Sequence, residues 1–121
     1  MSDEVRVVVV DDHVDGAESL AQLLALNGYS VKTAHDGTRA WALVEEFQPL
    51  CVLFDIKMPG IDGAELSERL REKYGNDIVL IAITGAPEND RQVAETFARV
   101  DYYLQKPLDI AKLQIALPPV R

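Results

Sequence analysis

Short apolar runs alternate along this chain with longer segments whose apolar residues recur at helical spacing. The runs predict five strands, at residues 6–10, 30–33, 50–54, 78–83 and 102–104. The longer segments predict five helices, at about residues 15–27, 38–47, 64–73, 88–99 and 109–117. Strands that alternate with helices are typical of an α/β protein with a parallel sheet. In the fourth helix, Val93, Phe97 and Val100 are expected to face the core.

Length and composition narrow the class of protein. The 121 residues are expected to form one domain, 1–121, whose core needs no disulfide. The single cysteine, Cys51, lies in an apolar run and is expected to be buried. No signal peptide or membrane span is recognisable, so the expected location is the cytoplasm, with no membrane partner. A formal charge of -8 disfavours direct binding to nucleic acid and favours proteins and cations as partners.

Candidate chemistry collects at the carboxyl ends of the predicted strands. Right-handed crossovers place these ends at one edge of a parallel sheet, where ligands bind in open α/β folds. The polar residues at or just beyond the strand ends are Asp11, Asp12, Asp55, Thr84 and Lys106. Each alone has a structural explanation: Asp12 or Asp15 as a helix cap, Thr84 as a turn residue, Lys106 as a surface charge. Their combination at one edge predicts a site.

The residue types at this edge favour a metal ion and phosphoryl chemistry. Three carboxylates repel one another unless a cation joins them, and oxygen ligands favour Mg2+ over zinc or copper. Aspartate can act as a nucleophile towards phosphorus, while a metal ion, Lys106 and Thr84 would position the phosphoryl oxygens. Asp55 is the candidate nucleophile because it stands alone after its strand, whereas Asp11 and Asp12 form a pair suited to metal.

Four segments, in this order and spacing, resemble the receiver domain of two-component response regulators over nearly the whole chain. They are Val10-Asp11-Asp12, residues 53–63 (LFDIKMPGIDG), Ala82-Ile83-Thr84-Gly85, and residues 101–107 (DYYLQKP). The resemblance implies a flavodoxin-like, doubly wound (βα)5 fold of the α/β class, with a five-stranded parallel sheet of order 2-1-3-4-5. It also implies a phosphorelay switch rather than an enzyme, with only weak autophosphorylation and autodephosphorylation.

The resemblance further implies a role for each matching residue. Asp55 would accept a phosphoryl group from a histidine kinase or a histidine phosphotransfer protein. Asp11, Asp12, Asp55 and the backbone carbonyl of Lys57 would hold Mg2+, with Mn2+ as a substitute. Thr84 would hydrogen-bond the phosphoryl group, and Lys106, directed by a cis Lys106–Pro107 peptide bond, would pair with it. Tyr103 would swing inward as Thr84 moves, which changes the surface of the fourth helix, fifth strand and fifth helix for a downstream protein partner.

Three other functions fit parts of the pattern. An aspartyl-phosphate phosphohydrolase resembling the haloacid dehalogenase family would carry a second acid two residues after its nucleophile, where this chain has Lys57. A flavodoxin-like cofactor binder would not place Asp11 and Asp12 beside a phosphate. A receiver-like binding module that is never phosphorylated typically lacks part of the acid set. These residues do not decide between a single-domain regulator and a piece of a larger hybrid kinase, or whether phosphorylation drives a homodimer.

Overall fold

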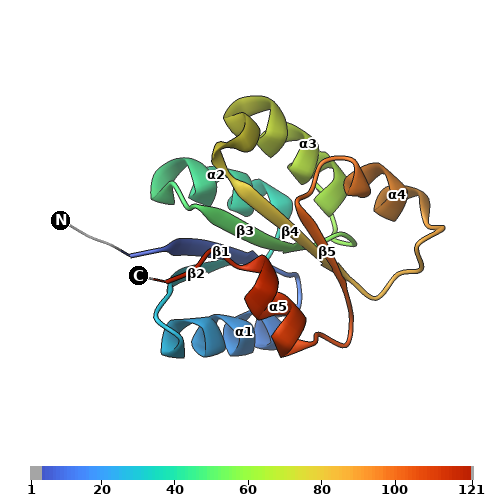
Figure 1. Cartoon of the computed structure of the whole chain (residues 1–121). Coiled ribbons are helices and arrows are strands. Elements are labelled where there is room, and N and C mark those ends of the chain that lie inside the picture. The colour runs from blue at the N-terminus through green and yellow to red at the C-terminus, as the bar shows by residue number, and fades with distance from the viewer. Residues whose placement is uncertain (1–3, 121) are drawn as a thin grey trace.

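The apolar runs form one parallel sheet in the computed structural model, which describes residues 4–120 (Figure 1). The strands are β1 (Arg6–Val10), β2 (Ser30–Ala34), β3 (Cys51–Asp55), β4 (Val79–Thr84) and β5 (Tyr102–Gln105). Their order is β2-β1-β3-β4-β5, and every neighbouring pair is parallel. The expected doubly wound fold of order 2-1-3-4-5 is therefore confirmed.

The helices lie in two layers, one on each face of the sheet. Their bounds are α1 (Val14–Leu26), α2 (Gly37–Phe47), α3 (Gly63–Tyr74) with the short 3-10 helix η1 (Gly75–Asp77), α4 (Arg91–Phe97) and α5 (Ile110–Ala116). Figure 1 shows α1 and α5 on one face, and α2, α3 and α4 on the other. Within residues 4–120, no helix combines the length and the apolar character needed to span a bilayer.

The two layers explain why the first strand is a continuous run of valines. Val8 and Val10 pack in the core under α2 and α3, whereas Val7 and Val9 pack in the core under α1 and α5. All four side chains are at most 2 % exposed. Full burial of one such side chain stabilises the fold by roughly 1.5–3 kcal/mol, so a strand covered on both faces favours apolar residues at every position. Cys51, in the neighbouring strand, is likewise buried, as expected, and burial raises the pKa of its thiol.

The fourth helix is shorter than the sequence predicts. It begins at Arg91 because the side chain of Asp90 accepts hydrogen bonds from the backbone N–H groups of Gln92 and Val93, which makes Asp90 its N-cap. The prediction that Phe97 faces the core is wrong, since Phe97 is 41 % exposed. Thr96 takes the buried position, because its hydroxyl donates to the carbonyl of Gln92, 2.7 Å away, and needs no water.

Candidate functional site

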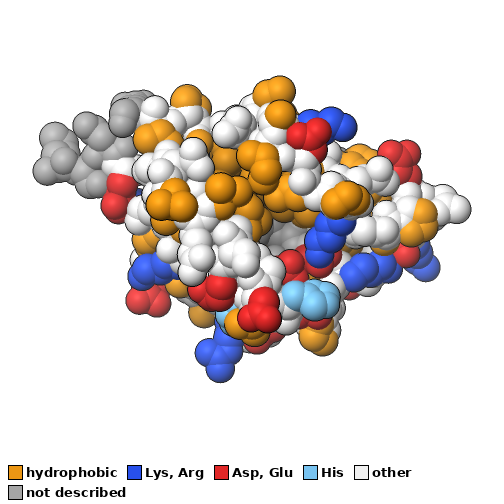
Figure 2. All heavy atoms as spheres, turned by 90° about the horizontal axis from the view of Figure 1, so that it is seen from below, with side chains coloured by type: hydrophobic (Ala, Val, Ile, Leu, Met, Phe, Trp, Pro, Cys, Tyr) orange, Lys and Arg blue, Asp and Glu red, His pale blue; other side chains and the backbone are white. Residues whose placement is uncertain are grey.

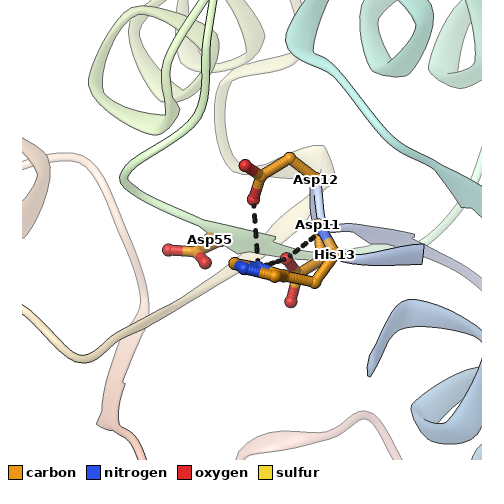
Figure 3. Close-up of side chains that lie close together, drawn as sticks. All are labelled: Asp11, Asp12, His13 and Asp55. Carbon is orange, nitrogen blue, oxygen red and sulfur yellow. Dashed lines mark hydrogen bonds and ion pairs between the residues drawn. The ribbon is translucent and has the colours of Figure 1, made fainter. Parts of the chain in front are cut away.

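Three carboxylates converge where β1 and β3 end. Val10 lies beside Phe54 in the sheet, so the chain leaves β1 at Asp11 and Asp12 next to Asp55, the last residue of β3. One oxygen from each carboxylate and one ring nitrogen of His13 all lie within 4.8 Å of one another (Figure 3). The structure therefore brings together the three acids that the sequence predicts, and it adds His13, which the sequence prediction left out of the site.

The acids after β1 keep their oxygens available for a cation. The N-cap position of α1 is His13, and its side chain makes no capping hydrogen bond, so the interpretation of Asp12 or Asp15 as the helix cap is wrong. Asp11 Oδ1 accepts a hydrogen bond of 3.0 Å from the backbone N–H of His13. Asp12 Oδ1 is buried and accepts no hydrogen bond from any described residue. A buried carboxylate oxygen without a donor is unfavourable, and a bound cation would satisfy it.

Lys106 is held against the same carboxylates. Its Nζ lies 2.8 Å from Asp55 Oδ2 and 3.7 Å from Asp11 Oδ2. The Lys106–Pro107 peptide bond is cis, as the resemblance implies, and the backbone N–H of Lys106 donates to the carbonyl of Thr84. Partial burial lowers the pKa of the Lys106 ammonium, but the hydrogen bond and charge of Asp55, with those of Asp11, outweigh this effect and raise the pKa above its ordinary value. Lys106 is therefore charged at neutral pH.

Thr84 lies further along the same edge, and Tyr103 lies within the neighbouring strand β5, two residues before its end. Thr84 ends β4 and is 1 % exposed, and its Oγ1 accepts a hydrogen bond of 3.1 Å from the backbone N–H of Ala86. Tyr103 lies beside Ala82 in the sheet, and its ring contacts Phe97 with 4.3 Å between centroids. The Tyr103 hydroxyl is buried without a hydrogen-bond partner among the described residues. That missing hydrogen bond lowers the cost of moving the ring.

The loop after β3 is pressed against Asp55. A Cβ atom at Gly63 would lie 2.5 Å from Ile56 Cα and 2.7 Å from the Asp55 carbonyl oxygen, so glycine permits this close approach. The backbone N–H of Lys57 donates to Asp55 Oδ1 over 3.2 Å. The side chain of Lys57 instead points to α4, where its Nζ lies 2.8 Å from Asp90 Oδ2. The hydrogen bond from Lys57 lowers the pKa of the Asp90 carboxyl despite partial desolvation.

A hollow of about 410 Å3 opens beside the cluster. Its polar lining includes Asp11, His13, Asp55 and Lys106, and its apolar walls come from the ends of β1, β3 and β4, from α1 and from the residues after β5. Figure 2 shows acidic side chains beside this hollow, with a Lys or Arg side chain and an imidazole at its edge. An incoming group can therefore reach Asp55 from solvent, although that side chain is only 9 % exposed.

The donor set fits a hard divalent cation. Mg2+ prefers oxygen ligands and keeps part of its water shell, which suits a few carboxylates at an open edge. Asp12 Oδ1, which accepts no hydrogen bond, and the clustered oxygens of Asp11 and Asp55 supply such ligands within residues 4–120.

Comparison with known proteins decides the family. The family model of the response regulator receiver domain matches residues 7–118. The chain belongs to this family. Receiver domains are signalling domains of two-component systems rather than conventional enzymes, and they bind Mg2+ at an acidic pocket.

Individual relatives agree with this assignment. Response regulator MprA of Mycobacterium bovis is 38% identical over 109 residues, which is 90% of this receiver domain and 47% of the relative. The chain thus spans about half the length of the curated relatives that it matches. A signal receiver domain of an HD domain-containing protein from Pseudomonas fluorescens aligns with a TM-score of 0.86 and 27% identity, covering 93% of this chain and 90% of that one. Response regulator TrrA of Thermotoga maritima, in complex with Mg2+-BeF, aligns with a TM-score of 0.80 and 30% identity, covering 93% and 99%.

Proposed function

We propose that this receiver domain is a phosphorelay switch in which Asp55 accepts a phosphoryl group from the phosphohistidine of a histidine kinase or a histidine phosphotransfer protein. The observation that carries the proposal is the placement of Asp55, nearly buried between the Lys106 ammonium and the carboxylates of Asp11 and Asp12. A carboxylate oxygen of Asp55 forms the new bond to phosphorus while the bond from phosphorus to the donor's imidazole nitrogen breaks. That nitrogen keeps the electron pair, and the product is an acyl phosphate.

Asp11, Asp12, Asp55 and the backbone carbonyl of Lys57 would hold Mg2+, with Mn2+ as a substitute. When bound, the cation supplies positive charge that offsets the charge on the transferred phosphoryl oxygens. The chain's own part is to fix the geometry. Asp11 is oriented by the backbone N–H of His13, and Asp55 by that of Lys57.

Lys106 and Thr84 would bind the phosphoryl oxygens. The Lys106 ammonium, already 2.8 Å from Asp55 Oδ2, needs only a small shift to pair with a phosphoryl oxygen on that carboxylate. The Thr84 oxygen accepts its hydrogen bond from Ala86, so its own hydrogen can be donated to the phosphoryl group.

The signal would be a shift between two populations of the same fold. Movement of Thr84 towards the phosphoryl group opens space into which the ring of Tyr103 can turn, and this repacks the surface of α4, β5 and α5. The phosphoryl group favours one conformation only by its difference in interaction energy between the two, and a few kcal/mol suffices. A downstream protein binds this surface. That protein can be a second copy of the same chain, which would give a phosphorylation-dependent homodimer. A net charge of -8 disfavours direct reading by nucleic acid.

Phosphorylation is tested by incubating the protein and its Asp55→Asn variant with Mg2+ and acetyl phosphate, and measuring intact mass over time. The wild type is expected to gain the mass of one phosphoryl group, and to lose that gain slowly after the donor is removed. Asp55→Asn, which keeps the size of the side chain and one of its two acceptor oxygens, is expected to gain none, and neither protein should react after Mg2+ is chelated.

Failure of the small donor is separated from failure of the site by a second measurement. Beryllofluoride mimics an aspartyl phosphate, and its Mg2+-dependent binding needs no donor. If the wild type neither gains mass nor binds beryllofluoride, the chain is a receiver-like binding module that is not phosphorylated, and the switch proposal is wrong.

A further inference from the structure

His13 lies beside the three carboxylates of Asp11, Asp12 and Asp55, although none of the roles above uses its side chain. It follows the two acids directly, and its side chain is 76% exposed, so the ring can rotate with little obstruction. Its backbone N–H is already bound to Asp11 Oδ1, which fixes the backbone from which the ring starts. The residue is therefore anchored at its backbone, and its ring is open to solvent.

The imidazole points at the place where a cation would be held. Nδ1 of His13 lies 3.3 Å from Asp11 Oδ1 and 3.4 Å from Asp12 Oδ1, so one ring nitrogen faces both carboxylates. Figure 3 shows the ring between these two side chains and extending towards Asp55. The carboxylate oxygen that it approaches on Asp12 is the buried one without a hydrogen bond.

The distances are short enough for four ligands of one ion. Donor atoms bound to the same ion at roughly 2.0–2.2 Å can lie at most about 4.4 Å apart. The three carboxylate oxygens and the ring nitrogen already lie within 4.8 Å of one another. Rotation of the exposed His13 ring supplies the remaining shift.

The geometry points to His13 as a ligand of the divalent cation: we propose that one of its ring nitrogens completes the site of Asp11, Asp12 and Asp55, and that it raises the affinity for transition-metal ions such as Mn2+ relative to Mg2+. This inference rests on the cation site of the proposed function. Imidazole nitrogen binds first-row transition metals much better than it binds Mg2+, which prefers oxygen. Mg2+ still binds through the carboxylates, whereas a transition metal gains one more bond.

The competing explanation is that His13 only pairs with the two acids when the metal is absent. The ring would then have to leave when the ion binds, and its removal would strengthen the binding of every divalent cation. Ligation has the opposite consequence, because removal of the ring would weaken the binding of transition metals selectively. The two explanations therefore differ in the sign of one measurement.

Mn2+ is the probe that tests the inference on the whole chain. Its binding to wild type, His13→Gln and His35→Gln is followed by electron paramagnetic resonance of the free ion, with Mg2+ as competitor. Pulsed resonance on the bound ion then detects coupling to an imidazole nitrogen. His35 is the matched control because it is the other of the chain's two histidines, and its Nδ1 contacts only the backbone carbonyl of Asp11 in this region.

Nitrogen coupling is expected in the wild type and in His35→Gln, and not in His13→Gln. The preference for Mn2+ over Mg2+ is expected to fall by about tenfold in His13→Gln only. The inference is overturned if the wild type binds Mn2+ without nitrogen coupling, if the coupling persists in His13→Gln, or if that variant binds both ions more tightly. In those cases the proposed function is untouched, whereas a wild type that binds neither ion overturns the cation site itself.

Discussion

At the scale of single residues, the surroundings of Asp12 suit a bound cation but are unfavourable for the stability of the metal-free protein. Asp12 Oδ1 is buried without a hydrogen bond, and one oxygen of the Asp12 carboxylate lies within 4.8 Å of one oxygen each of Asp11 and Asp55. Lys106 offsets part of this negative charge, but it contacts Asp55 and Asp11 rather than Asp12. Without a cation, Asp12 is therefore a charged group that the fold does not fully compensate.

Asp12→Asn is expected to stabilise the metal-free protein by about 1 kcal/mol, because it removes a like charge and keeps the shape. Urea denaturation in the presence of a chelator measures this change. The same variant should lose most of the stabilisation that Mg2+ gives the wild type. Asp15→Asn is the control, since Asp15 is an exposed acid in the first turn of α1, and its replacement should not stabilise the protein. Equal stabilisation by both variants would point to overall charge instead of the site.

At the scale of elements, four of the five α-helices within residues 4–120 begin with an aspartate that caps the backbone. Asp36, Asp62, Asp90 and Asp109 each accept hydrogen bonds from the first turn of α2, α3, α4 and α5. The exception is α1, whose N-cap His13 makes no side-chain cap. A cap contributes about 1 kcal/mol, so α1 gives up this stabilisation where the preceding acids face the metal site.

The far end of α3 is fixed by one side chain. The Arg71 guanidinium donates to the carbonyl oxygens of Arg99, Gly75 and Ile78 and to Asp101 Oδ2. These acceptors belong to the turn after α3 and the connection from α4 to β5. One planar group thus joins the end of α3 and the turn that follows it to the connection from α4 to β5, which is distant in sequence.

Arg71→Lys is expected to destabilise the fold by about 2 kcal/mol. A lysine ammonium cannot reproduce the planar set of N–H donors of the guanidinium, so it leaves partly buried carbonyl oxygens without hydrogen bonds. Arg69→Lys on the same helix is the matched control, since Arg69 makes only an exposed pair with Glu65, worth a few tenths of a kcal/mol. Both are measured by urea denaturation. Similar small losses in the two variants would contradict the structural role given to Arg71.

At the scale of the whole molecule, the residues that form the buried cores and the charged residues of the candidate site lie at different parts of the sheet. Both faces are covered by helices, so the buried cores lie above and below the strands, whereas the charged residues lie where the strands end. The residues proposed to bind a ligand at this edge lie at or just after the ends of β1, β3, β4 and β5. Ligand binding to the folded state alone should therefore stabilise the entire domain.

Mg2+ is expected to raise the free energy of unfolding in proportion to the logarithm of its concentration, reaching about 2.7 kcal/mol at a hundred times the dissociation constant. Urea denaturation in MgCl2, compared with NaCl of equal ionic strength, separates specific binding from the screening of a chain with net charge -8. Beryllofluoride should add further stability to the wild type but not to Asp55→Asn. An equal gain in both salts would show that only screening operates.

Local pattern was sufficient for the order of the strands and helices and for which charged residues lie close together. Runs of four to six apolar residues and helical spacing are properties of a few neighbouring positions, so strands such as β1 could be placed from sequence. The carboxyl ends of parallel strands meet at one edge, which predicted that Asp11, Asp12, Asp55 and Lys106 lie together. Their convergence followed from topology alone.

Only the tertiary structure decided which of several neighbouring residues is buried, which forms an ion pair and which faces the site. Thr96 replaces Phe97 in the core because its hydroxyl bonds within its own helix, and Asp90 ends up paired with Lys57, which lies in another loop. The ring of His13 faces the carboxylates of Asp11 and Asp12 because the chain turns directly after β1. Such contacts depend on loop paths and on which side of a helix meets the sheet, and both are set by packing between distant segments. The sequence by itself determined the order of the strands and helices and which charged residues gather at the edge of the sheet.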